Sequence, residues 1–127
     1  MNLEIKSIRS DVLAPGETPE DSYNFNIPLR VEIGEKSETG GEVFHFTAAS
    51  PAGLEGEVGG GEFKLLRGYI LMARFDWATA RRAIENIINH ARGYRDGSWA
   101  EAIEFFSRYG RYDSENIHSQ PSGERRV

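Results

Sequence analysis

The sequence predicts an α+β domain, in which an antiparallel β-sheet of about four to five strands carries two C-terminal helices on one face. Three observations predict this class. Apolar and polar side chains alternate across residues 25–33, which is typical of a strand with one buried face. In residues 76–91 and 98–109 the apolar side chains recur at helical spacing instead. Finally, the strand-like segments precede the helical ones, an order that favours a sheet and helices in separate layers.

The first strand is expected at residues 3–8, where apolar and polar residues begin to alternate. Proline, glycine and acidic residues then predict a loop over residues 11–24. The clearest strand, residues 25–34, places five apolar side chains on one face. Pro28 lies within it. Because proline donates no backbone hydrogen bond, this strand is expected at an edge of the sheet or to begin irregularly.

A polar segment with glycines, residues 35–41, predicts a hairpin loop that leads into a third strand at residues 43–48. Residues 50–61 contain five glycines and are expected to form a mobile loop or a connection between strands. A fourth strand is expected at residues 68–74. Its more continuous apolar run favours a central position or one beneath a helix.

The two helices have recognisable ends. Asp76 is a good N-cap for the first helix, and Gly93 suits its end. Ser98 and Glu101 form a capping box that opens the second helix, and Gly110 is expected to end it. The buried face expected for the second helix consists of Trp99, Ala102, Ile103, Phe106 and Tyr109, with Phe105 off this stripe and turned to a neighbouring element or a partner.

Length and composition favour one soluble domain. A chain of 127 residues fits a single domain, expected over residues 1–117, and the polar residues 118–127 are expected to be a disordered tail. The chain has no cysteine, which excludes disulfides and thiolate sites and is compatible with a reducing cytoplasm. We find neither a secretion signal nor an apolar run of about 18 residues, so we expect a cytoplasmic protein without a membrane partner.

Charge separates the two halves of the chain. The net charge of −5 disfavours nucleic-acid binding, which requires lysine and arginine to displace counterions from phosphates. Residues 1–62 carry a net charge of −8, and residues 63–127 carry +3. The acidic half is either an ordinary solvated surface or a negative face that steers a basic partner into place.

No catalytic, metal or cofactor site is expected. The three histidines are separated by 45 and 28 residues, which is not the clustered spacing of metal ligands. Ser50 and Ser98 lack the context of a nucleophile elbow, and residues 59–61 lack the Gly-Lys-Ser/Thr ending of a phosphate loop. The sequence therefore favours a binding module over an enzyme.

Six short pieces of the chain, in order and at matching intervals, carry a resemblance to a known family. They are Ile33-Gly34, residues 41–47, residues 50–54, Phe75-Asp76-Trp77, residues 97–101 and residues 109–113. Together they resemble the immunity protein 8 family of bacterial polymorphic toxin and contact-dependent inhibition systems. Ala49, Gly53 and Tyr112-Asp113 depart from the residues that family members often carry at these places.

The resemblance implies a cytoplasmic protein that protects its producer by binding the C-terminal domain of a cognate toxin, with no catalysis of its own. Many antibacterial toxins are nucleases with basic clefts, which an acidic protein fills as a phosphate mimic. The candidate partner-binding residues are therefore acidic: Glu32, Glu35, Glu38, Glu42, Glu55, Glu57 and Glu62. For a partner that is not basic, the exposed faces of the two helices are the alternative.

Two other functions remain open. A small-molecule-binding or enzymatic domain would need a well-formed apolar pocket with convergent polar groups between sheet and helices. An adaptor domain would self-associate through the strand that contains Pro28. The sequence does not determine the oligomeric state, the toxin or its activity.

Overall fold

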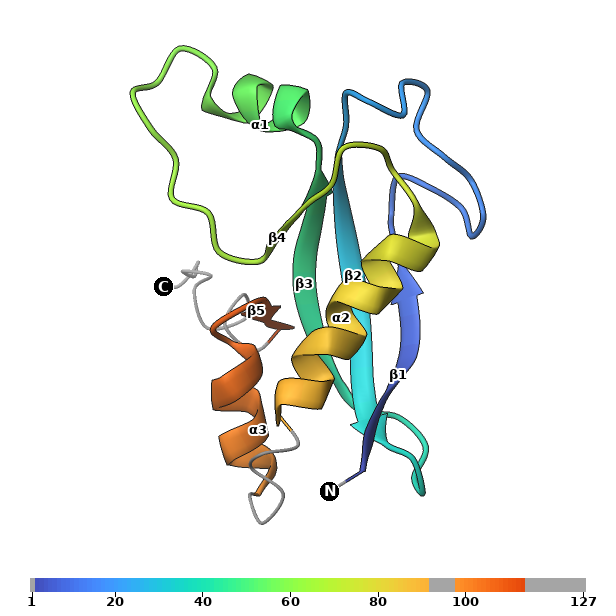
Figure 1. The fold of residues 1–127 in the computed structure, drawn as a ribbon. Helices are drawn as coiled ribbons and strands as arrows, with labels where there is room; N and C mark the ends of the chain where they lie inside the picture. The colour runs from blue at the N-terminus through green and yellow to red at the C-terminus, as the bar shows by residue number, and fades with distance from the viewer. Residues whose placement is uncertain (1, 92–97, 114–127) are drawn as a thin grey trace, which may run out of the picture.

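A computed structural model describes residues 2–91 and 98–113 of the chain (Figure 1). The elements in chain order are β1 (Leu3–Arg9), β2 (Asn26–Glu35), β3 (Glu42–Ala49), α1 (Pro51–Val58), β4 (Tyr69–Leu71), α2 (Trp77–Ala91), α3 (Trp99–Phe106) and β5 (Arg111–Tyr112). The five strands form one sheet in the order β1-β2-β3-β4, and β5 pairs with β3. Helices α2 and α3 lie on the same face of this sheet (Figure 1). The predicted α+β class, with two C-terminal helices on one face, is confirmed.

Two predictions fall on residues that the structure does not describe, namely the disordered tail at residues 118–127 and the helix end at Gly93. A helix that could span a bilayer is absent from residues 2–91 and 98–113, because the helices there are too short or too polar.

The core lies between the helices and one face of the sheet, and the alternation seen in the sequence determines which side chains enter it. Ile5 pairs with Ile33 across β1 and β2, and Val31 pairs with Phe44 across β2 and β3; all four side chains are buried. Residues paired across strands share a face of the sheet. We call the opposite face the outer face; its residues are Pro28, Arg30, Glu32, Val43, His45, Thr47, Tyr69, Leu71 and Arg111. Neither α2 nor α3 covers it (Figure 1).

Of the two alternatives predicted from Pro28, the edge strand is wrong, since β2 lies between β1 and β3; the first residues of β2, Pro28 included, nevertheless have no pairing with β1. Thr47, opposite Pro28, donates its backbone N–H to the carbonyl of Gly68 at 2.7 Å, away from β2. In an antiparallel pair this places the Pro28 nitrogen on the side of β1. Because β1 ends opposite Arg30, no strand lies there to accept a hydrogen bond. A central strand therefore tolerates proline at this position.

Part of the glycine-containing segment predicted as a loop forms helix α1. Ser50 is its N-cap and accepts a hydrogen bond from the backbone N–H of Gly53, while Pro51 occupies the first turn. Gly59 ends the helix with a φ of 58°, a backbone conformation that glycine adopts without strain. The capping serine and the proline are visible in the sequence, but the five glycines of residues 50–61 favoured a loop in the prediction.

Strand β4 runs parallel to β3, so the sheet is mixed and not wholly antiparallel. The crossover through α1 and residues 59–68 makes this possible, because parallel neighbours need a connection of roughly a dozen residues or more. Strand β4 has only three residues and pairs with β3 alone, at the margin of the sheet. The fourth strand is therefore shorter than the predicted residues 68–74, and of the two positions expected for it the central one is wrong.

Both C-terminal helices begin where their caps predict. The carboxylate of Asp76 accepts the backbone N–H of Thr79 at 3.2 Å, and Ser98 forms the predicted capping box that opens α3. Helix α3 packs against both α2 and β5. It consequently buries a wider face than one stripe, and Phe105, predicted to lie off that stripe, is buried against Phe106 at a ring distance of 5.7 Å. Tyr109, predicted to be buried, lies beyond the end of α3 and is 42% exposed.

Candidate partner-binding site

The seven candidate glutamates form two groups at opposite ends of the sheet. Glu32, Glu35, Glu38 and Glu42 surround the β2–β3 hairpin, whereas Glu55 and Glu57 lie in α1 and Glu62 follows it. Asn26, the first residue of β2, donates a hydrogen bond of 2.6 Å to Glu57, while Glu35 is the last residue of the same strand. A strand of 10 residues spans about 30 Å. The structure therefore does not bring all seven together, and Figure 1 shows the hairpin and α1 far apart.

The hairpin group is itself divided between the two faces of the sheet. Glu32 pairs with Val43 on the outer face, whereas Glu35 pairs with Leu3 and Glu42 pairs with Ile33 on the helix-covered side. The hairpin end of the fold is thus acidic around its rim and does not present one flat negative patch.

Strand β1 adds a carboxylate to this end that the prediction from sequence did not include. Glu4 pairs with Gly34, next to the hairpin, and its carboxylate accepts a hydrogen bond of 2.9 Å from Lys6. That hydrogen bond lowers the pKa of Glu4 below its usual range. Lys6 also donates to the carbonyl of Glu38 at 2.7 Å. Only the strand pairing reveals the proximity of Glu4, because 30 residues separate it from Gly34.

Glu42, which is partly buried, is bonded to strand β5. The hydroxyl of Tyr112 donates to its carboxylate, and the Tyr112 ring packs 5.4 Å from that of Phe44. Next to this pair, the imidazole of His45 is 2.7 Å from the carboxylate of Asp113. The structure gives His45 no hydroxyl partner among the described residues, so this pair does not form the base of a nucleophile triad there. We therefore interpret both contacts as fastenings of β5 to β3.

Glu57 fastens the segment that follows α1. Its carboxylate is bonded to Asn26 and to the ammonium group of Lys64. The hydrogen bond from Lys64 lowers the pKa of Glu57 and raises the pKa of Lys64. Glu55 and Glu62, by contrast, are exposed to solvent. Glu57 thus has a role in holding the fold together, whereas Glu55 and Glu62 face solvent.

Residues 58–71, which we call the apolar loop, expose an unusual set of large apolar side chains. They are Val58, Phe63, Leu65, Leu66 and Leu71, of which Phe63 is 73% and Leu65 87% exposed. Elsewhere in the described part of the chain, only Val12, Tyr23 and Tyr109 are comparable. Monomeric proteins rarely expose such side chains contiguously unless they bind something. The prediction from sequence assigned no role to residues 63–67, although three apolar residues outside any expected strand, Phe63, Leu65 and Leu66, were a usable signal.

A groove of roughly 340 Å³ lies where the apolar loop meets the outer face. Its lining includes Pro28, His45, Thr47, Leu65 and Tyr69. The permanently charged groups in the lining are Lys64, Arg67 and Arg111, and no carboxylate is among the residues that line it. Lys64 is paired with Glu57 and His45 with Asp113, whereas Arg111 forms no ion pair with a described residue; we call this lining the cationic groove.

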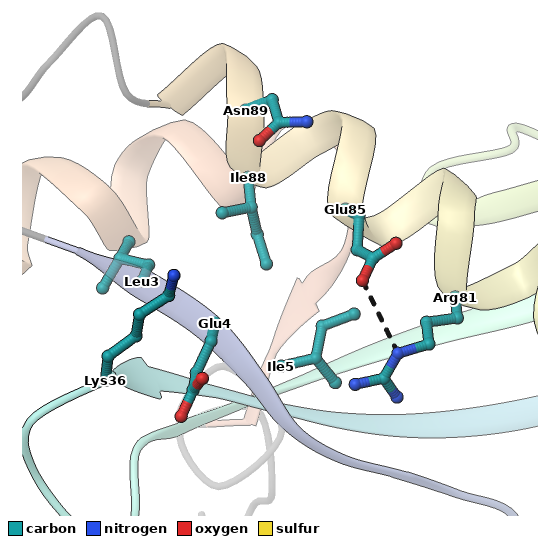
Figure 2. A pocket seen from close by; sticks show the side chains of 8 residues that line it. All are labelled: Leu3, Glu4, Ile5, Lys36, Arg81, Glu85, Ile88 and Asn89. Carbon is teal, nitrogen blue, oxygen red and sulfur yellow. Dashed lines mark ion pairs between the residues drawn. The ribbon is translucent and has the colours of Figure 1, made fainter.

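A second cleft, of roughly 390 Å³, separates the edge strand β1 from α2 (Figure 2). Arg81 and Glu85 of α2 form an ion pair of 3.6 Å on one wall, and Glu4 and Lys36 lie on the other side. Because charged side chains line both walls of the cleft, it is not the apolar pocket that a small-molecule site would require. In residues 2–91 and 98–113, no group of three or more histidine or carboxylate side chains is arranged to hold a metal ion.

Comparison with known proteins adds one match. A family model described as Immunity protein 8 matches residues 3–116, which is most of the chain. No curated protein and no solved structure matches.

Proposed function

Because the chain belongs to the immunity protein 8 family, we propose that it binds the C-terminal domain of a cognate bacterial toxin and neutralises it as a 1:1 complex. The match over residues 3–116 is the observation that carries this proposal. Residues 1–117 act as the binding domain, in the cytoplasm of the cell that produces the toxin, and the protein has no catalytic activity of its own. The toxin systems are those of contact-dependent or polymorphic toxins.

Inhibition by binding is a matter of surface and charge. The acidic hairpin end attracts a basic partner over a distance of about 10 Å, the screening length at moderate salt. Glu32, Glu35 and Glu38 are the candidates here, because Glu42 is already bonded to Tyr112. A basic toxin cleft, such as that of a nuclease, would be oriented by this end and blocked from its substrate.

The proposal is tested by co-expression with the toxin domain encoded next to this gene. We expect the chain to restore survival of cells that express the toxin and to co-purify with it at 1:1. If the toxin kills cells despite soluble, folded chain, and no complex forms, the proposed function is wrong for this pair.

The role of the hairpin end is tested separately by Glu35→Gln and Glu38→Gln in one chain. We expect about tenfold slower association with the toxin at low salt, because each change removes one steering charge. The matched control is Glu20→Gln with Glu104→Gln, which removes two exposed carboxylates elsewhere. Equal rates for the two variants would show that total charge, and not the hairpin end, governs the encounter.

A further inference from the structure

We infer that the apolar loop and the cationic groove behind it form a docking surface for a toxin segment whose apolar side chains are flanked by carboxylates. The inference rests on the proposed function and names the part of the molecule that the toxin contacts. It departs from the expectation that glutamates supply the contact. Two independent features of the described residues carry it, one apolar and one electrostatic.

The apolar feature is the exposure of anchor-sized side chains on a short segment. Phe63, Leu65 and Leu71 are 73%, 87% and 61% exposed and lie within nine residues of one another. Binding energy in protein interfaces concentrates in a few such large side chains once a partner excludes water from them. Leu71 belongs to the outer face of the sheet, and Leu65 lines the groove that lies against that face.

The loop is also held in place at several points, which reduces the entropy lost on binding. The Lys64–Glu57 ion pair fastens its middle to α1. Thr47 of β3 donates to the carbonyl of Gly68, and the N–H of Met72 donates to the carbonyl of Ala49 at 2.9 Å. The exposed side chains are thus presented from a segment with fixed ends.

The electrostatic feature decides the chemistry of the partner. Lys64, Arg67 and Arg111 line the groove, and no carboxylate is among the lining residues, although the ammonium group of Lys64 is already paired with Glu57 of α1. Arg111 forms no ion pair with a described residue and is exposed. A basic segment would be repelled by Arg111, whereas an aspartate or glutamate side chain could pair with its guanidinium group. The occupant that fits is therefore an apolar polypeptide segment that carries negative charge.

The test measures the affinity of the purified chain for the adjacent toxin domain, made inactive by mutation of its own active site, by titration calorimetry. Phe63→Ser with Leu65→Ser should weaken binding about 30-fold or more, the effect of losing interface hot spots. Both positions are exposed, so the fold should remain intact, which circular dichroism and the melting temperature verify. The matched control is Val12→Ser with Tyr23→Ser, which removes two similarly exposed apolar side chains far along the chain and should leave affinity within about twofold.

A single charge reversal, Arg111→Glu, tests the sign of the partner. We expect weaker binding, since the new carboxylate would face acidic groups; stronger binding would show a basic partner here and overturn the inference. If the wild-type chain binds the toxin domain and the Phe63/Leu65 variant binds it equally tightly, the inference is also overturned, while the proposed function stands. A wild-type chain that dimerises in sedimentation, with the Phe63/Leu65 variant monomeric, would identify a second copy as the occupant and refute a toxin segment. No binding by the wild type refutes the proposed function itself.

Discussion

Replacing Ser50 by alanine should destabilise this protein far more than the removal of one hydroxyl suggests. The Ser50 side chain is fully buried, and its oxygen accepts two backbone hydrogen bonds of 3.1 Å, from the N–H of Gly53 and from the N–H of Phe25. The first contact caps α1, and the second holds the segment that enters β2. Ser50 thus joins two elements that are 25 residues apart.

The expected magnitude follows from the two contacts. Loss of an N-cap costs about 1 kcal/mol. The N–H of Phe25 would in addition remain buried without a partner, which costs about 1–3 kcal/mol. The free energy of unfolding should therefore fall by about 2–4 kcal/mol, and the melting temperature by roughly 10 °C.

Urea denaturation followed by circular dichroism measures this loss, and a second cap provides the control. Ser98 caps α3 at an exposed position, where among the described residues its side chain accepts the N–H of Glu101 alone, at 3.4 Å, so Ser98→Ala should cost about 1 kcal/mol. If Ser50→Ala destabilises the chain no more than Ser98→Ala does, the N–H of Phe25 is satisfied in another way and the reasoning is refuted.

Two further outcomes are expected. Gly53→Ala should destabilise the chain strongly, because the added Cβ would overlap the backbone carbonyl of Phe25. Gly56→Ala in the same helix places its Cβ in open space and should stabilise the chain by about 0.5–1 kcal/mol. Urea denaturation measures both variants, and equal changes in the free energy of unfolding would contradict the packing at Gly53. Glu57 has a pKa lowered by the hydrogen bond from its lysine partner, so its stabilising contribution is present above the ordinary glutamate value of 4.5 and is lost as pH falls through the lowered pKa in the folded state. Glu57→Gln should accordingly reduce the acid dependence of stability below that pH, and a wild-type-like acid titration of the variant would refute this.

Several elements of the fold follow from local physics and were predictable. Apolar residues alternate with polar ones across residues 27–33, and the apolar side chains lie in the core, as predicted. Asp76 and Ser98 cap the helices that they were predicted to cap, because a cap is satisfied by residues two or three positions along the same chain.

The pieces that carry the family resemblance belong mostly to this structural framework. Ser50 and Gly53 make the α1 junction, and a Cβ on Gly110 would collide with the ring of Phe46. The pair formed by His45 and Asp113 joins β5 to β3. Gly53 and Asp113 are among the positions where this chain departs from the usual family residues, so the resemblance rests on the other residues of these pieces, and the apolar loop lies outside every matching piece. This explains why the family was recognisable from the sequence and the exposed apolar loop was not.

The sequence by itself determined the class of fold, the two capped helices and the buried face of the sheet, since each depends on spacing along the chain. Tertiary structure alone decided the parallel pairing of β4, the central place of β2 despite Pro28, and the burial of Phe105. It also separated the seven glutamates between two ends of the sheet and set the apolar loop beside the cationic groove. The physical reason is that strand pairing and packing join residues distant in sequence, and no local period or charge count specifies which of those distant residues meet.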